Sequence, residues 1–187
     1  MDINIRTATV EDAAEILKIY APYVENTAIS FEYDVPSLEE FRGRIENTLE
    51  KYPYLVATDE GGAILGYAYC GPFKTRAAYD WAVETTIYLR DDAKGKGVGR
   101  ALYSRLEDYL SAMNITNLNA CIASIEVEDE HLTNASSKFH ERMGYTLVGE
   151  FHKCGYKFNR WYNMVWMEKI IGEHEANQKP IIKFSEL

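Results

Sequence analysis

Apolar and polar positions repeat along this chain with two different periods. A period near two, or a short continuous apolar run, predicts β-strands at residues 3–6, 54–58, 63–69, 81–89, 118–122, 145–149 and 162–167. Apolar residues spaced by three and four positions predict helices that begin after Thr9, at Pro36-Ser37, after the glycine-rich segment 94–99 and at Asn134. Because strands outnumber helices and mostly follow one another, we expect an α/β (α+β) fold, with a mixed or antiparallel sheet and helices on its faces.

Turn residues and prolines set several of the boundaries. Asp59-Glu60-Gly61-Gly62 separates two strand-like runs, which predicts a hairpin. Pro22 is expected to disturb the end of the first helix, and Pro53 to end the second helical region. The length of 187 residues suits one domain, which we place at 1–172, followed by an extended polar tail at 173–187 that packs on the body.

The charge balance narrows the classes of partner. Twenty basic and 29 acidic side chains give a formal net charge of −9, which argues against a nucleic-acid binder. The first residues show no charged region followed by a long apolar run, and no window approaches the roughly 18 apolar residues of a membrane span. We therefore expect a cytoplasmic protein without a membrane segment.

Three cysteines, Cys70, Cys121 and Cys154, show no C-x-x-C spacing. An odd number without that spacing disfavours a disulfide framework and excludes a zinc ribbon. Each lies in an apolar or aromatic stretch, so we expect buried small apolar side chains and no metal site.

A glycine-rich basic segment follows the strand that ends at Leu89. Lys94-Gly95-Lys96-Gly97-Val98-Gly99-Arg100 leads directly into a helix, so several backbone N–H groups lie at a helix N-terminus. Glycine permits close approach of a ligand, and the helix dipole favours an anion. The segment matches neither the P-loop pattern G-x-x-x-x-G-K-[ST] nor the dinucleotide fingerprint G-x-G-x-x-G. An ordinary helix-entry loop stays open as the alternative.

Glu84 is a single carboxylate inside a strand of β-forming residues. Alternation places the odd-numbered residues of 83–89 on one face, and Glu84, Thr86 and Tyr88 on the other. An unpaired glutamate in a central strand is costly unless it has a partner or a function. A solvated position or a salt bridge is one interpretation. Beside an anion-binding loop, we favour a base that faces a cofactor site.

These segments resemble the GNAT superfamily of N-acetyltransferases. Strand, [Q/R]-x-x-G-x-[G/A], helix is its acetyl-CoA motif, and Lys94 to Gly99 matches it with lysine in the first position. The block Gly71 to Trp81, followed by Glu84, resembles the phosphinothricin and methionine sulfoximine acetyltransferase subfamily. So do Phe139 to Tyr145 and Trp161-Tyr162-Asn163, and the similarity spans nearly the whole chain.

The resemblance implies acetyl-CoA as co-substrate, bound without a metal where the strand before the glycine loop splays from its neighbour. Backbone groups of that strand would bind the pantetheine arm, and N–H groups of residues 95–100 would bind the pyrophosphate. Asn134 matches a position that commonly binds the pantetheine arm. The implied cofactor-binding residues are Ile87, Tyr88, Leu89, Lys94, Gly95, Lys96, Gly97, Val98, Gly99, Arg100 and Asn134.

The implied reaction acetylates the α-amine of a small amino acid or a toxic analogue, such as phosphinothricin or methionine sulfoximine or sulfone. The amine must lose a proton before it attacks a thioester, and a buried carboxylate of raised pKa suits that task. Glu84 matches the subfamily's catalytic carboxylate and is the expected general base, for direct attack in a ternary complex. His140 stands where many members have a tyrosine that protonates the departing thiolate. Its roles as acid, second base, pocket wall or helix-dipole partner stay open.

The substrate-binding residues that the resemblance implies are Phe31, Lys74, Arg76 and Tyr79. Lys74 and Arg76 suit a substrate carboxylate. Glu32 departs from relatives that carry a basic residue there, and so removes positive charge from the substrate side.

Other functions fit parts of the same pattern. Within the class, the acceptor could be a polyamine, an aminoglycoside or a peptide N-terminus. A non-catalytic CoA-binding module would keep the glycine loop without needing Glu84, and a nucleotide-binding protein is a further alternative. Subfamily members are typically homodimers, so a homodimer is expected. Fourteen tyrosines exceed what this site uses, since Tyr79 and Tyr88 alone flank it.

Overall fold

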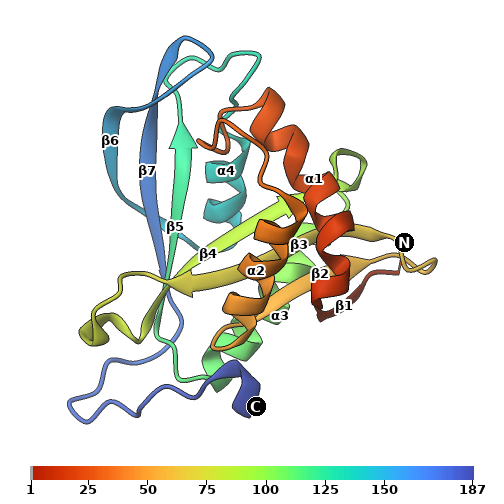
Figure 1. The fold of residues 1–187 in the computed structure, drawn as a ribbon. Helices are drawn as coiled ribbons and strands as arrows, with labels where there is room; N and C mark the ends of the chain where they lie inside the picture. Colours follow the sequence, from red (N-terminus) through yellow and green to blue (C-terminus); the bar gives the residue numbers. More distant parts are fainter. Residues whose placement is uncertain (1) are drawn as a thin grey trace.

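The computed structural model describes residues 2–187, and an open sheet of seven strands forms its centre (Figure 1). The strands are β1 (Asn4–Thr7), β2 (Tyr54–Thr58), β3 (Ile64–Pro72), β4 (Ala82–Leu89), β5 (Asn117–Ser124), β6 (Thr146–Lys157) and β7 (Arg160–Ile170). The α-helices are α1 (Ala13–Asn26), α2 (Leu38–Leu49), α3 (Val98–Ala112) and α4 (Ala135–Arg142). The strand order is β1-β2-β3-β4-β5-β7-β6, and of these neighbours β4 and β5 pair in parallel and the others antiparallel.

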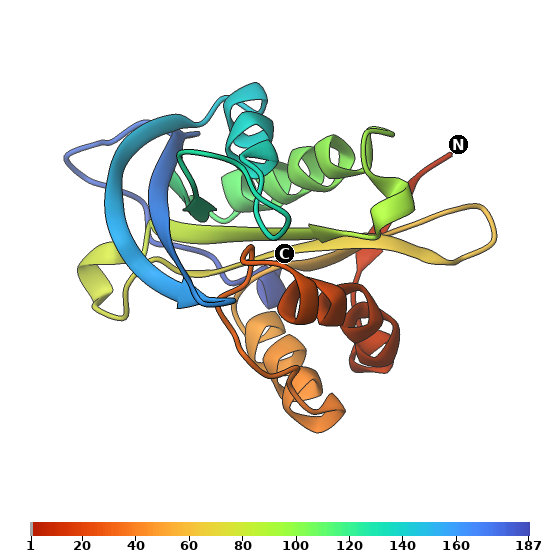
Figure 2. The ribbon, with the colours of Figure 1, turned by 90° about the horizontal axis from the view of Figure 1, so that it is seen from above.

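Helices cover both faces of this sheet, as Figure 2 shows from above. The helices α1 and α2 pack on one face, in a core that includes Ile16, Ile45 and Tyr67. The helix α3 packs on the opposite face, in a larger core that includes Val83 and Leu106. The predicted fold class, a mostly antiparallel mixed sheet between helices, is confirmed.

The parallel pair β4–β5 separates partway along its length. The two strands pair at Ala82↔Asn117, Val83↔Leu118 and Glu84↔Asn119, and the ladder ends there although β4 continues to Leu89. This is the predicted splay in the sheet. It opens a cleft whose walls are strand edges, so backbone groups as well as side chains line it.

Two elements differ from the sequence-based expectation. The helix α1 continues past Pro22 to Asn26. Pro22 costs the helix one hydrogen bond, but the burial of Tyr20 and Val24 on either side of it outweighs that loss. The strands β6 and β7 are much longer than predicted and meet in a two-residue turn at Phe158 and Asn159, both with positive φ. Register shifts in β6 interrupt the two-residue period that would have revealed its length.

The C-terminal segment 173–187 runs against the body of the protein. The Trp81 indole N–H donates to the Lys179 carbonyl at 2.7 Å, and the Asn114 amide donates to the Pro180 carbonyl at 2.9 Å. The Phe184 N–H donates to the Lys51 carbonyl at 3.0 Å. These bonds hold the segment across the end of the sheet where β4 and β5 begin.

The part of the chain that the structure describes, residues 2–187, has no helix long and apolar enough to cross a membrane. The same residues bring together no cluster of three or more His, Cys, Asp or Glu side chains that could hold a metal ion.

Candidate active site

Glu84 lies where β4 and β5 begin to separate. It is the last residue of their ladder and lines a cleft of about 470 Å³ between the two strands. Within residues 2–187, its partly buried carboxylate makes no hydrogen bond or ion pair. Burial raises the pKa of Glu84, and the positive charge of Lys74 opposes that rise. An unpaired carboxylate of raised pKa at a cleft is placed to accept a proton.

The hydrogen-bond pattern of β4 shows which backbone groups face the cleft. At the end of the β3–β4 ladder, the Arg90 N–H donates to the Leu65 carbonyl at 2.8 Å. Such bonds recur at every second residue of an antiparallel ladder, so the backbone groups of Tyr88 are bonded to β3. Those of Ile87 and Leu89 face the cleft. Only these two of the three predicted strand residues therefore offer backbone groups to a ligand.

The opposite wall of the cleft has the same construction. In the β5–β7 pair, the Ile171 N–H donates to the Thr116 carbonyl at 2.9 Å, so the backbone groups of Cys121 and Ala123 point away from β7 toward the cleft. The cleft thus has two unpaired strand edges. An extended amide-bearing chain can bind to such edges as an added strand does.

The glycine loop lies at the N-terminus of α3. Gly97 is the N-cap residue with a φ of 86°, a left-handed conformation that favours glycine. The N–H groups of residues 95–100 bond to no acceptor among residues 2–187, and the first helical bond of α3 comes from Ala101 to the Gly97 carbonyl. Six such donors, together with the helix dipole, are of the kind that suits a phosphate group.

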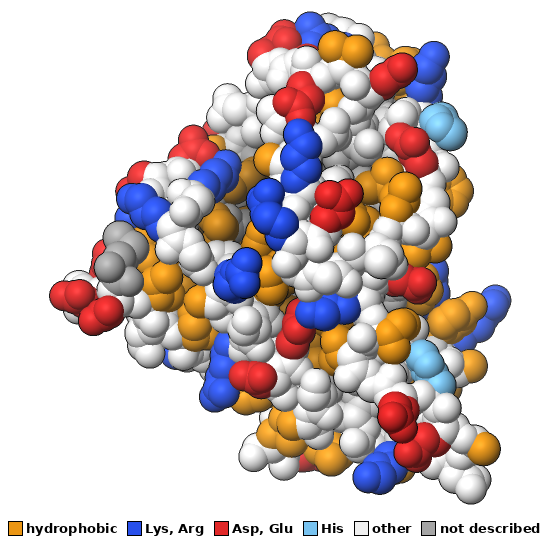
Figure 3. Space-filling model, turned by 180° about the vertical axis from the view of Figure 1, so that it is seen from behind, with side chains coloured by type: hydrophobic (Ala, Val, Ile, Leu, Met, Phe, Trp, Pro, Cys, Tyr) orange, Lys and Arg blue, Asp and Glu red, His pale blue; other side chains and the backbone are white. Residues whose placement is uncertain are grey.

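The basic side chains around this loop differ in whether an acidic side chain pairs with them. Lys94 pairs with Asp91 at 2.6 Å, whereas Lys96 and Arg100 are exposed and pair with no acidic side chain in residues 2–187. Figure 3, which views the molecule from the side of α3 and α4, shows Lys and Arg side chains spread over this face among acidic ones. The loop, not the whole face, is therefore the cationic feature.

His140 is buried in the wall of the cleft and has both ring nitrogens bonded. Its Nδ1 lies 2.8 Å from the Ser136 carbonyl, and its Nε2 lies 2.9 Å from the Tyr103 hydroxyl. A carbonyl only accepts, so Nδ1 carries the proton and Nε2 accepts from Tyr103. The Tyr103 hydroxyl also lies 3.4 Å from the Thr85 hydroxyl, which contacts Tyr145 at 3.0 Å. Burial lowers the pKa of His140 to about 4.

We expect His140 to stay neutral throughout the working pH range. Its folded-state pKa lies below the ordinary value of 6.5, so protonation favours the unfolded chain, and stability decreases as the pH falls from 6.5 toward 4. In His140→Gln, which can keep one donor and one acceptor, we expect a smaller decrease in melting temperature over this interval. Thermal melts at pH 4.5, 5.5, 6.5 and 7.5 test this. Equal pH dependence in both proteins would show that folding does not lower the pKa of His140.

The loop before α2 covers one side of the cleft. Phe31 lines the cleft, and its ring lies so close to Gly155 of β6 that a Cβ there would overlap it. The neighbouring Glu32 faces away into a polar cluster, where it accepts from Arg44 at 2.6 Å and from the Tyr20 hydroxyl at 2.6 Å. The negative charge of Glu32 is therefore balanced by Arg44.

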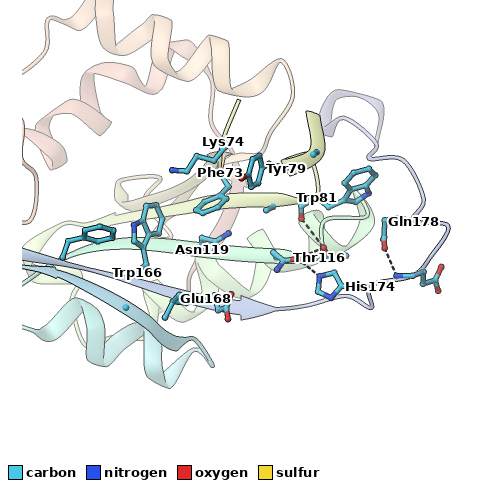
Figure 4. A pocket seen from close by; sticks show the side chains of 17 residues that line it. Phe73, Lys74, Tyr79, Trp81, Thr116, Asn119, Trp166, Glu168, His174 and Gln178 are labelled. Carbon is cyan, nitrogen blue, oxygen red and sulfur yellow. Dashed lines mark hydrogen bonds between the residues drawn. The ribbon is translucent and has the colours of Figure 1, made fainter. Parts of the chain in front are cut away.

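A second and larger cavity, of about 760 Å³, adjoins the end of β4 opposite the glycine loop. Lys74, Tyr79 and Trp166 line it, and Lys74 Nζ lies 5.3 Å from the Trp166 ring centre (Figure 4). Asn119, which lies opposite Glu84 in the β4–β5 ladder, also lines this cavity, so the cavity lies near the cleft. Arg76 is exposed and lines neither cavity. The structure thus separates the basic pair: Lys74 borders the site, and Arg76 lies outside it.

Two other predicted features have different surroundings from those expected. The Asn134 side chain donates to the Ile125 carbonyl at 2.8 Å and accepts from the Ile125 N–H at 3.3 Å, so it ties α4 to the end of β5. Cys70 is buried as predicted, but the expectation for Cys121 and Cys154 was wrong. Both are exposed and line the cleft. The separation of β4 and β5 leaves the face of β5 at Cys121 uncovered, and Cys154 lies on the edge strand β6.

Comparison with known proteins gives a consistent result. Residues 5–166 match the family model described as an acetyltransferase (GNAT) domain. The chain is 32% identical over 167 residues to the phosphinothricin N-acetyltransferase of Streptomyces viridochromogenes, covering 89% of this chain and 87% of that protein. It is 32% identical over 169 residues to an L-methionine sulfoximine/L-methionine sulfone acetyltransferase of Pseudomonas aeruginosa, covering 90% of this chain and 94% of that protein.

A solved structure shows the same fold with a ligand bound. The phosphinothricin acetyltransferase of Sinorhizobium meliloti in complex with acetyl-CoA superimposes with a TM-score of 0.86 at 35% identity, covering 96% of this chain and 94% of that one. Sequence, fold and cleft agree. This chain belongs to the GNAT superfamily, in its phosphinothricin and methionine sulfoximine acetyltransferase subfamily, and is an N-acetyltransferase.

Proposed function

We propose that this enzyme transfers the acetyl group of acetyl-CoA to the α-amine of a small amino acid or a toxic analogue of one. The candidates are phosphinothricin, methionine sulfoximine and methionine sulfone, for which the relatives are named. The observation that carries the proposal is the unpaired carboxylate of Glu84 at the point where β4 and β5 separate. A base at this point lies between the strand edges that suit a pantetheine arm and the cavity beside Lys74.

The residues present fit acetyl-CoA. Donors at residues 95–100 suit its pyrophosphate, and the edges at Ile87, Leu89, Cys121 and Ala123 suit its amide-bearing arm. When bound, acetyl-CoA supplies the acetyl group as a thioester. The Leu89 carbonyl already accepts from the Tyr23 hydroxyl. On β4, the N–H and carbonyl of Ile87 are therefore the pair best available to the amides of the ligand.

Glu84 then acts as the general base. It accepts a proton from the substrate ammonium, directly or through a water, and the neutral amine attacks the thioester carbonyl in a ternary complex. The C–S bond then breaks, and the departing CoA thiolate takes up the proton that the acylated nitrogen releases. A backbone N–H of the splayed strand, of which Ile87 has one facing the cleft, stabilises the developing oxyanion. With its tautomer fixed by Ser136, His140 acts as a wall that orients the Tyr103 hydroxyl. Lys74 is placed to bind the substrate carboxylate.

An acetyl-CoA consumption screen over amino acids and amines tests this function. We expect turnover with methionine sulfone, methionine sulfoximine or phosphinothricin, and little with spermidine, because Lys74 disfavours a polycation. A preference for spermidine, or acetyl-CoA binding without any turnover, would exclude the proposed acceptor class.

We infer that the enzyme acts as a homodimer. The strand β6 forms an outer edge of the sheet, and its exposed apolar side chains include Leu147, Val148 and Phe151, each more than half accessible. A long apolar edge strand promotes pairing with another chain. Light scattering should give twice the mass of 21.4 kDa. In Val148→Lys/Phe151→Lys we expect the monomer mass, and a wild-type monomer at micromolar concentration would refute the inference.

A further inference from the structure

Four of the fourteen tyrosines, Tyr20, Tyr54, Tyr67 and Tyr69, gather on the face of the sheet that α1 and α2 cover. Together with Arg44 and other residues of α2, they line a second chamber of about 330 Å³ between α1, α2 and the sheet. The volume is far above the roughly 15 Å³ that one water needs. The rings of Tyr54, Tyr67 and Tyr69 are nearly parallel, with interplanar angles of 4° to 7°.

Two of these tyrosines carry hydroxyl groups without a protein partner. Tyr54 and Tyr67 are 2% and 1% exposed, and their hydroxyls bond to no group of residues 2–187. Within the same residues, the hydroxyl of Tyr52 is the one side-chain polar atom that is both fully buried and without a partner. The hydroxyls of Tyr54 and Tyr67 also lack partners but are not fully enclosed, so they face open space. That space is the chamber. Buried hydroxyls of this kind bind water or a ligand atom.

The charges around the chamber select the kind of ligand. Arg44 bonds to Glu32 at 2.6 Å and to Glu40 at 2.7 Å, so its positive charge is already balanced by two carboxylates. Burial raises the pKa of Tyr54 and of Tyr67 well above the ordinary value, so both hydroxyls stay protonated and can donate. The chamber therefore offers hydrogen-bond donors without net positive charge. A neutral group with acceptor oxygens fits it better than an anion does.

The chamber adjoins the Glu84 cleft. Tyr69 lines both cavities, and it lies opposite Thr86 in the β3–β4 ladder. Thr86 follows Glu84 by two positions on the same face, a separation of about 7 Å along a strand. This is close to the length of a methionine-sized side chain, so an amino acid with its amine at Glu84 can extend past Tyr69 toward Tyr67.

We propose that this chamber binds the distal end of the acceptor side chain, and that Tyr54 and Tyr67 select a neutral, oxygen-bearing group such as a sulfone, a sulfoximine or a carboxamide. The proposal rests on the proposed function, because it places the substrate amine at Glu84. It assigns a role to the tyrosine excess and to Glu32, which neutralises Arg44 and so makes the chamber unsuited to an anionic phosphinate.

The test compares acetylation of methionine sulfone with that of norleucine, which lacks the oxygens. We expect the ratio of their kcat/KM values to fall about fivefold to tenfold in Tyr67→Phe and in Tyr54→Phe, since each loses one donor to the sulfone. Tyr52→Phe is the matched control: it also removes a buried, unpartnered hydroxyl, but one outside the chamber, and its ratio should equal that of the wild type. Melting temperatures confirm that each variant is folded.

If the wild-type enzyme is active and the ratio of kcat/KM values is unchanged in Tyr54→Phe, in Tyr67→Phe and in the double variant, the proposed role of the chamber is refuted. The proposed function is then unaffected. A wild type that acetylates no amino acid would overturn the proposed function. In that case, calorimetric titration of methionine sulfone into the CoA-bound protein tests by itself whether the chamber binds the sulfone. Weaker binding by Tyr67→Phe than by Tyr52→Phe supports it, and equal or absent binding refutes it.

Discussion

Glu84→Gln is expected to lower kcat by about 10²-fold to 10⁴-fold, the usual range for loss of a general base. Glutamine keeps the shape of the side chain but cannot accept the proton of the substrate ammonium. Because Glu84 makes no hydrogen bond or ion pair within residues 2–187, its replacement disrupts no structural contact in that range. Steady-state kinetics with methionine sulfone and acetyl-CoA at pH 7.5 measures the loss.

The pH profile distinguishes loss of a base from other causes. Burial raises the pKa of Glu84, so the base is ionised and active above that raised value and is lost as the pH falls through it. We expect the wild-type kcat to decline on the acidic side at a pH above the ordinary glutamate range. In Glu84→Gln this step should disappear, and the deficit should shrink at high pH, where more of the amine is already neutral.

Two controls make the result specific to this site. Glu46→Gln removes the same charge from an exposed position on α2 and should retain full activity. Acetyl-CoA should bind Glu84→Gln with unchanged affinity, since its binding elements are backbone groups and the glycine loop. Turnover that persists unchanged in Glu84→Gln would show that another group, or water alone, takes the proton.

Local patterns in the sequence were enough to predict where several residues of this site lie. The alternation in β4 placed Glu84 correctly, because a two-residue period determines which face a strand residue occupies. The glycine loop was recognisable for the same reason: backbone donors at a helix N-terminus follow from the residues themselves. Such features depend on neighbours in the chain.

Contacts between distant segments were not predictable in this way. The Tyr103–His140 bond joins residues 37 positions apart, and only the folded structure shows that both ring nitrogens of His140 are bonded within the wall of the cleft. The chamber draws its lining from α1, α2, β2 and β3, and its open hydroxyls depend on how these elements pack. A surplus of tyrosines was visible in the sequence, but where they gather was not.

Lys157 is the strongest example of such a contact and leads to the second large prediction. Its side chain is 4% exposed, and its ammonium donates to the carbonyls of Val24, Thr27 and Ser30 at 2.7, 2.9 and 2.7 Å. It thereby closes the C-terminal end of α1, where helix carbonyls lack partners and the dipole favours a cation. The same bonds fix the loop that leads to Phe31. Burial lowers the pKa of Lys157.

In Lys157→Met, which keeps the length of the side chain, we expect a loss of about 3–5 kcal/mol in the free energy of unfolding, because three carbonyls lose a charged donor. For a domain of this size the melting temperature should fall by on the order of 10 °C. Lys153→Met, at an exposed position of the same strand, should melt within about 2 °C of the wild type. Activity should also fall in Lys157→Met, since Phe31 would lose its anchored loop. If both variants have the melting temperature of the wild type, water must hydrogen-bond to the carbonyls at the end of α1 in place of Lys157. The loop must then be held by Phe31 and Glu32.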